Sequence, residues 1–115
     1  MIPGKYNIVC PQGSTLDQQL TYSIDDIVVN LTGYSARMKV KEKYSSTLST
    51  LDLTNVNGGI VLGGTLGTIN VVVTSTQSSE ISAKEYIYDL ELVSSANIVT
   101  RIIEGKFIVT PEVTK

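Results

Sequence analysis

The chain has 115 residues, the length of one ordinary domain, so a second domain would have no room for a core of its own. Hydrophobic residues make up 42% and charged residues 17%, which is typical of folded globular proteins and excludes a disordered chain. The net charge of −2 argues against a nucleic-acid partner, and no run approaches the roughly 20 apolar residues of a membrane helix. We therefore expect one domain over residues 1–115 that binds neither nucleic acid nor membrane.

Alternation of apolar and polar residues, which marks a strand with one buried face, recurs along the chain. It predicts these strands in order: 6–10, 16–24, 36–44, 48–54, 68–74, 85–93 and 99–109, with a short extra strand at 59–62. The first and fourth of them are the weaker candidates. About seven strands with turn residues between them are the pattern of an antiparallel sandwich. The sequence thus predicts an all-β fold, a single immunoglobulin-like antiparallel β-sandwich.

The order of the strands in such a sandwich predicts which of them share a sheet. We expect the strands at 36–44, 85–93 and 99–109 in one sheet, and those at 16–24, 68–74 and 48–54 in the other. Asn57-Gly58 is a strong signal for a hairpin turn. The glycine-rich stretch from Gly63 to Gly67 reads as a tight connection between two short strands. Only 75–84 has the composition to hold a helical turn.

A charge ladder is predicted on the outer face of the first of these sheets. The basic side chains that share a face of the 36–44 strand are Arg37, Lys39, Lys41 and Lys43. On the 85–93 strand Asp89 and Glu91 point outward, and the sheet order places this strand beside the basic one. Opposite charges across neighbouring strands contribute roughly 0.2–1 kcal/mol per pair. An acidic neighbour would also relieve the repulsion between four like charges.

Two tyrosines near the start of the 85–93 strand, Tyr86 and Tyr88, face the predicted core. One of them is a candidate for the tyrosine corner of a Greek-key sandwich, in which the hydroxyl donates to backbone a few residues upstream. A core aromatic with its hydroxyl at the edge is the equal alternative.

The residues that most enzymes use are scarce in this chain. It has no histidine, which removes the commonest general base and transition-metal ligand, and its single cysteine, Cys10, reads as a small buried hydrophobe. No serine stands with a convincing base, so we predict no catalytic residue, no cofactor and no metal. A calcium site from Asp25, Asp26 and Asn30 is the alternative to a solvated turn there. Anion binding by the basic ladder is a lesser alternative, because aromatics interleaved on that face are absent.

Several stretches resemble, in their joint order and spacing, a family of small structural domains of tailed bacteriophages and prophages. They are LTGYSARM at 31–38, NGGI at 57–60, GGTLGTI at 63–69, YIYDLEL at 86–92, VTR at 99–101, EGKFIV at 104–109 and TPEVT at 110–114. The chain resembles the immunoglobulin-like domain that forms the N-terminal part of upper-baseplate, receptor-binding-complex proteins in some siphophages. The resemblance covers residues from about Gly13 to Thr114.

The resemblance implies a non-enzymatic virion component of the tail, baseplate or neck, made in the host cytoplasm, that docks other virion proteins such as tail fibres and copies of itself. The sequence ends after the domain without a fibre segment, which favours an adaptor or ring component over a receptor binder. We expect the short extensions at 1–5 and 111–115 to be ordered by partners, for instance by adding a strand to a neighbouring subunit. The alternatives are a capsid decoration or head-fibre protein of the same fold and, from another class, a carbohydrate-binding module.

Overall fold

A computed structural model describes residues 4–114 and is all-β, as the alternation predicts. Two short helical elements interrupt the strands: the 3-10 helix η1 (Gly64–Leu66) and the helix α1 (Ser75–Ser79). The strands are β1 (Gly4–Lys5), β2 (Ile8–Pro11), β3 (Leu16–Thr21), β4 (Ser23–Ile24), β5 (Ile27–Val28), β6 (Ser35–Lys41), β7 (Leu51–Thr54), β8 (Ile60–Leu62), β9 (Thr68–Val73), β10 (Glu85–Val93) and β11 (Val99–Thr110). Within residues 4–114 no helix is long and apolar enough to cross a membrane.

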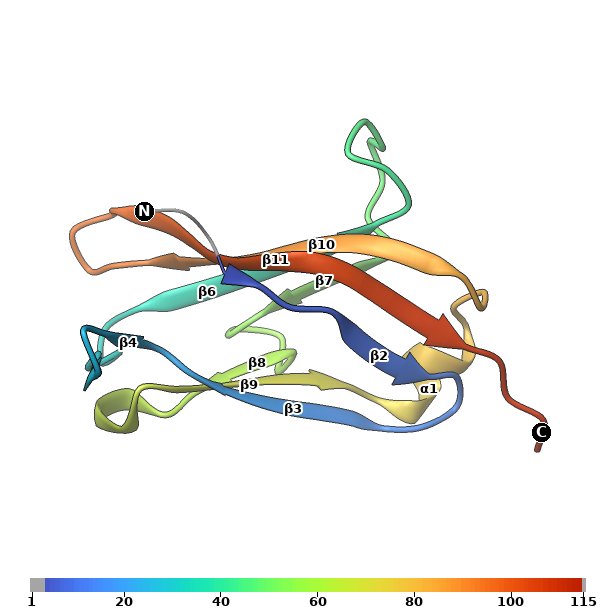
Figure 1. The fold of residues 1–115 in the computed structure, drawn as a ribbon, viewed down its shortest axis with the longest axis horizontal. Coiled ribbons are helices and arrows are strands. Elements are labelled where there is room, and N and C mark those ends of the chain that lie inside the picture. Colours follow the sequence, from blue (N-terminus) through green and yellow to red (C-terminus); the bar gives the residue numbers. More distant parts are fainter. Residues whose placement is uncertain (1–3, 115) are drawn as a thin grey trace.

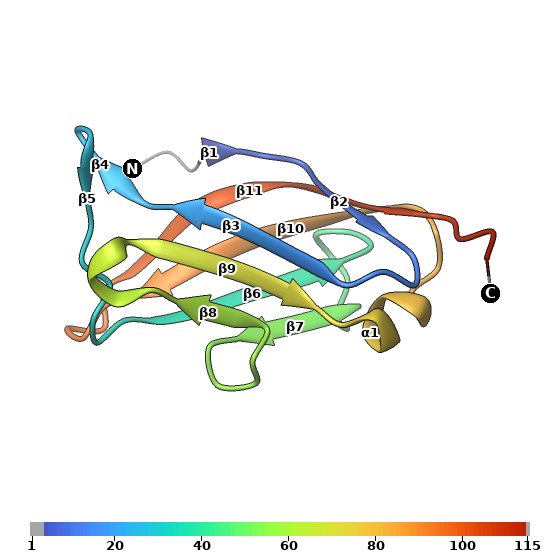
Figure 2. The ribbon, with the colours of Figure 1, turned by 90° about the horizontal axis from the view of Figure 1, so that it is seen from below.

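The strands form two sheets that face one another (Figures 1 and 2). The larger sheet has the order β1-β11-β10-β6-β7, and β2 also pairs with β11. The smaller sheet has the order β3-β9-β8, and β4 and β5 form a separate two-stranded ribbon. The joint membership of β6, β10 and β11, and that of β3 and β9, agree with the sheets predicted from strand order.

The core lies between the two sheets and is built from the predicted inward faces. Met38 and Val40 of β6, together with Leu90 and Leu92 of β10, are fully or almost fully buried. The smaller sheet contributes the whole predicted face of β9, which is Ile69, Val71 and Val73. The predicted phase of these strands is therefore confirmed. Cys10 is buried with a free thiol, and burial raises the pKa of that thiol.

The prediction for the 48–54 strand was wrong. β7 pairs with β6 at the margin of the larger sheet and does not join β3 and β9. Asn57-Gly58 consequently closes no hairpin, because β7 and the following β8 belong to different sheets. The Asn57 side chain instead accepts hydrogen bonds from the backbone N–H groups of Thr54 and Gly59, and so fixes the turn that carries the chain between the layers.

The N-terminal segment also differs from its prediction, because it pairs with its own chain. β1 and β2 run parallel to β11, in register from Gly4 opposite Ile103 to Pro11 opposite Thr110. Residues 4 and 5 therefore belong to the domain, whereas the rest of the expected 1–5 extension lies outside the described residues. At the other end β11 stops at Thr110 before Pro111, which has no N–H to donate. Glu112 N–H donates to the Gln12 side chain, so the start of the 111–115 segment is held within the chain, and Lys115 lies outside the described residues.

Candidate docking surfaces

The outer face of the larger sheet carries the predicted charge ladder on adjacent strands. In the antiparallel pairing of β6 with β10, Arg37 stands opposite Glu91 and Lys39 opposite Asp89. Arg37 Nε donates to Glu91 Oε1 at 2.8 Å. The side chains are about half exposed for Arg37 and a quarter exposed for Glu91, so solvent screens the pair and its net contribution is about 0–1 kcal/mol.

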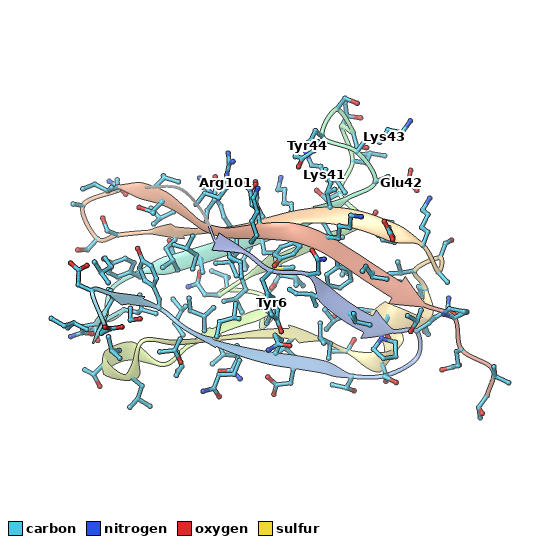
Figure 3. The ribbon with its side chains drawn as sticks, in the orientation of Figure 1. Tyr6, Lys41, Glu42, Lys43, Tyr44 and Arg101 are labelled. Atoms are coloured by element: carbon cyan, nitrogen blue, oxygen red, sulfur yellow. The ribbon has the colours of Figure 1, made fainter. Side chains whose placement is uncertain are left out.

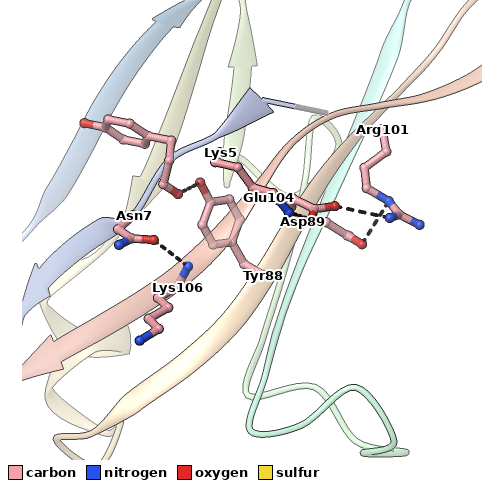
Figure 4. A network of polar contacts seen from close by, with 8 residues as sticks. Lys5, Asn7, Tyr88, Asp89, Arg101, Glu104 and Lys106 are labelled. Carbon is pink, nitrogen blue, oxygen red and sulfur yellow. Dashed lines mark hydrogen bonds and ion pairs between the residues drawn. The ribbon is translucent and has the colours of Figure 1, made fainter. Parts of the chain in front are cut away.

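A third strand adds charges that the sequence reasoning missed. Arg101 of β11 lies 3.4 Å from Asp89 and 3.3 Å from Glu104 (Figure 4). Lys5 of β1 pairs with the same Glu104 carboxylate. A signal was available, because Arg101 and Glu104 are two of the three charged residues of β11, but they stand three residues apart and so fall on opposite phases of the alternation. The pairing of β10 with β11 shifts register between Leu90 and Glu91, where β11 has one extra residue. This shift brings the Arg101 and Glu104 side chains to the same outer face.

The carboxylates of this network have pKa values shifted in opposite directions. The hydrogen bond from the Lys5 ammonium, followed by that from Arg101, holds the pKa of Glu104 below its usual value. Partial burial raises the pKa of Asp89, although the Arg101 guanidinium acts to lower it. The network therefore places one firmly ionised carboxylate next to one that protonates more readily.

Lys43 was predicted on the ladder but lies off it. β6 ends at Lys41, and the next residues form a loop that rises from the sheet (Figure 3). A local turn holds Lys43 there: its N–H donates to Ser46 Oγ, and its carbonyl accepts from Ser46 N–H. Strand alternation does not continue through this turn, so Lys43 loses the outward phase that a longer strand would have given it.

The ladder and the loop enclose an open groove of about 200 Å³ on this face. Tyr44 from the loop lines it with 87% of its surface exposed. The residues around it are Arg37, Lys39, Lys41, Ile87, Tyr88, Asp89, Glu91, Arg101 and Glu104. The groove thus offers charged and aromatic groups for recognition of a partner. Tyr44 is thus an exposed aromatic residue on this face, where the alternation in the sequence predicted none.

Tyr86 and Tyr88 are both buried, and each hydroxyl donates to a backbone carbonyl. Tyr86 Oη donates to the carbonyl of Ser82 at 2.8 Å, four residues upstream, which is the geometry of a tyrosine corner. Tyr88 Oη donates to the carbonyl of Tyr6, which ties β10 to the connection between β1 and β2 (Figure 4). Burial raises the pKa of both hydroxyls.

We expect Tyr86→Phe to lower the free energy of unfolding by about 0.5–1.5 kcal/mol, because it deletes this hydrogen bond and little packing. Urea unfolding monitored by circular dichroism measures the change. Tyr44→Phe is the matched control, since its hydroxyl is in solvent, and it should unfold like the unmodified protein. Equal midpoints for the two variants would contradict a structural role for the Tyr86 hydroxyl.

One end of the molecule exposes aliphatic side chains from three separate elements. They are Ile24, Ile27 and Val28 of the β4–β5 ribbon, Leu66 of η1, and Ile98 and Val99 of the β10–β11 turn and strand start, each 45–72% exposed. Figure 1 shows the three elements together at the left end of the long axis. The hydrogen bond from Leu31 N–H to Gly64 carbonyl links η1 to the loop after β5. We refer to these six side chains as the apolar end.

The Asp25-Asp26 turn joins β4 to β5 at the tip of the ribbon, and both residues adopt positive φ, at 52° and 63°. Residues 4–114 contain no group of three or more acidic, histidine or cysteine side chains placed to hold a metal ion. Asn30, the third residue of the suggested calcium site, accepts a hydrogen bond from Thr32 N–H through its side-chain oxygen.

No family model matches this chain, and no curated protein matches its sequence significantly.

Proposed function

We propose that the chain is a non-enzymatic structural protein of a tailed-phage virion, an immunoglobulin-like adaptor or ring component of the tail, baseplate or neck. In this role it docks other virion proteins, such as tail fibres, and copies of itself. The immunoglobulin-like assignment is supported by the grouping of β6, β10 and β11 against β3 and β9, and by the Tyr86 corner. The virion assignment is supported by the sequence resemblance described above.

The observation that carries the docking role is the apolar end. Exposed aliphatic residues scattered singly are ordinary, but several on neighbouring loops at one end mark a contact surface. Asp25 and Asp26 stand in the turn between Ile24 and Ile27, so charged side chains accompany the apolar ones at this end. Protein–protein interfaces likewise combine apolar and polar side chains.

Substitution of Ile27 by aspartate tests this role. A carboxylate buried without a partner in an apolar contact is costly, so we expect Ile27→Asp to lower incorporation into particles at least tenfold, which corresponds to about 1.4 kcal/mol or more. Incorporation is measured by complementing a phage that lacks the gene and quantifying the chain in purified virions. Val56→Asp is the matched control, because Val56 is 88% exposed in the β7–β8 connection, outside the apolar end.

If Ile27→Asp and Val56→Asp are incorporated equally, the apolar end is not the docking surface. A cryo-electron microscopy map of the virion separates a site on the tail, baseplate or neck from one on the capsid, which would indicate the decoration or head-fibre alternative. Absence of the chain from purified virions would overturn the virion assignment as a whole.

The groove beside Tyr44 favours one second candidate, a carbohydrate-binding module. Sugar-binding sites use exposed aromatic rings together with planar polar groups, and Tyr44 lines the groove together with Arg37, Asp89 and Arg101. Glycan-array binding that Tyr44→Ala abolishes would support this candidate, whereas an array without signal would reject it for the glycans tested.

A further inference from the structure

The smaller sheet has one long edge at which backbone groups point away from the chain. β3 pairs with β9 on one side only, and no described strand pairs with its other side. Figure 2 shows β3 along the margin of its sheet, with β1 and β2 in the other layer. The hydrogen bond from Tyr22 N–H to the carbonyl of Gly67, the residue before β9, shows which residues of this segment direct their backbone groups toward β9. Tyr22 is one of them.

Antiparallel ladders alternate, so every second residue before Tyr22 also bonds to β9, and the residues between them point their N–H and C=O groups outward. The backbone N–H and C=O groups of Leu16, Gln18 and Leu20 therefore face β9. Those of Asp17, Gln19 and Thr21 face the open edge. The other side of β9 agrees with this phase, because Val72 N–H donates to Gly59 carbonyl in the β8 direction. The Gln18 side-chain amide donates to the Gln19 carbonyl at 3.3 Å, which is compatible with a carbonyl that points away from β9.

This edge has few of the devices that protect exposed strands from pairing, since Asp17 is its one charged residue. Proteins commonly protect edges by shortness, proline, lysine or a bulge. β3 has six residues, none of them proline or lysine, and keeps an unbroken register with β9 from Leu16 to Thr21. The opposite edge strand, β8, has only three residues. In the larger sheet the N-terminal edge is broken between β1 and β2 and ends at Pro11.

We propose that β3 pairs antiparallel with β3 of a second copy of this chain, about a twofold axis at Gln19. In this register Gln19 stands opposite Gln19 of the second copy, and Asp17 stands opposite Thr21. All three are residues whose backbone groups face outward, so the ladder closes with every one of them paired. If the register between the two copies of β3 shifted by one residue, core-facing side chains of one copy would stand beside solvent-facing side chains of the other.

The side chains fit a second copy of the same strand. Asp17 is the only charged residue of β3, and the twofold axis puts the two Asp17 carboxylates at opposite ends of the new ladder. No like charges therefore face each other across it. On the inner face Leu16 meets Tyr22 of the second copy, and Leu20 meets Gln18. These inner-face side chains are half-buried in the single chain, so pairing removes further apolar surface from water.

The inference rests on the proposed assembly role and deepens it by naming one self-contact. It is tested on the isolated chain, whereas docking through the apolar end is tested by incorporation into particles. A monomeric chain would therefore overturn the strand pairing without overturning the apolar end as a docking surface.

A charge exchange at the twofold axis gives the sharpest test. Gln19→Lys alone and Gln19→Glu alone place like charges opposite each other, whereas an equimolar mixture places lysine opposite glutamate. We expect sedimentation velocity at up to about 1 mM to show dimers for the unmodified chain, because a single strand pair is a small and weak interface. Each variant alone should dimerise at least about tenfold more weakly, and the mixture should recover.

Gln19→Pro is the second variant, since it removes an outward N–H but no hydrogen bond to β9, and it should be a folded monomer. Thr76→Lys, on α1 and outside the edge, is the control for added charge and should dimerise normally. An unmodified chain that stays monomeric at about 1 mM, well above the dissociation constants of specific weak pairs, would overturn the proposal. So would a mixture of the two charge variants that behaves like either variant alone.

Discussion

Phe107→Ala is expected to lower the free energy of unfolding by about 3–5 kcal/mol. Phe107 is the only phenylalanine of the chain and is fully buried in the larger sheet. Its neighbours across β10 and β2 are Tyr86 and Ile8, both buried, so the cavity would open where the N-terminal strand, the last strand and the tyrosine corner meet. A loss of this size is a large fraction of the stability of a small domain.

Urea unfolding followed by circular dichroism measures this loss. Val9→Ala is the control, because Val9 lies on β2 next to Ile8 but is 51% exposed, and it should change stability by no more than about 0.5 kcal/mol. If Phe107→Ala unfolded at the same urea concentration as Val9→Ala, the contact between β2 and β11 would not be part of the core.

Gly105→Ala is expected to cost about 2–4 kcal/mol and to release the N-terminal segment from β11. The reason is space. A Cβ at this position would meet the carbonyl oxygen of Tyr6 well inside contact distance and the Tyr6 carbonyl carbon at 2.9 Å. Backbone cannot yield as a flexible side chain can, so β1 and Tyr6 must move away. That movement breaks the Tyr6 N–H bond to Glu104 carbonyl and leaves the buried Tyr88 hydroxyl without its acceptor.

Hydrogen exchange distinguishes this mechanism from general destabilisation. The amide of Tyr6 should lose protection in Gly105→Ala, while amides of β9 in the other sheet keep theirs up to global unfolding. Gly4→Ala is the matched control on the pairing strand, because its Cβ would stand 3.6 Å from the nearest backbone oxygen, an ordinary contact. Full protection of Tyr6 in Gly105→Ala would show that the segment is not held against that glycine.

The strands that could be predicted from sequence were those with one buried and one exposed face. In β6, β9 and β10 the alternation is long and regular, so Met38, Val71 and Leu90 were placed in the core without knowledge of the sheets. Alternation shows which side chains of a short strand are buried, but it does not show which sheet the strand joins. Leu51 and Leu53 of β7 are buried at the margin of the larger sheet, and their alternation would look identical in the smaller one.

The pairing of the N-terminus could not be predicted for a related reason. β1 and β2 run parallel to the last strand, and parallel pairing between distant segments leaves no turn signal in the sequence. Gly105 is the nearest thing to such a signal, because a glycine inside a strand marks the close approach of another backbone. Its meaning depends on Tyr6, which is far from it along the chain.

For the candidate surfaces, sequence phase placed the basic ladder with Arg37 on the face beside Asp89 and Glu91, but it missed Arg101 and Tyr44. Arg101 reaches the outer face through a register shift, and Tyr44 does so from a loop that follows no alternation. The apolar end was missed as well. Ile24 was placed on the inward face of a strand over 16–24, but it lies in β4, which pairs only with β5 and leaves Ile24 exposed.

The parallel course of β2 and β11 also determines how the domain carries a load. β1 begins toward one end of the long axis and the chain leaves β11 at the other (Figure 2). A tension applied through these two ends slides β2 along β11, so the ladder bonds from Ile8 to Pro11 are stressed together and not one after another. Bonds loaded together resist force better than bonds broken one at a time, so we expect the pairing of β2 with β11 to be the part of the fold that resists such tension most.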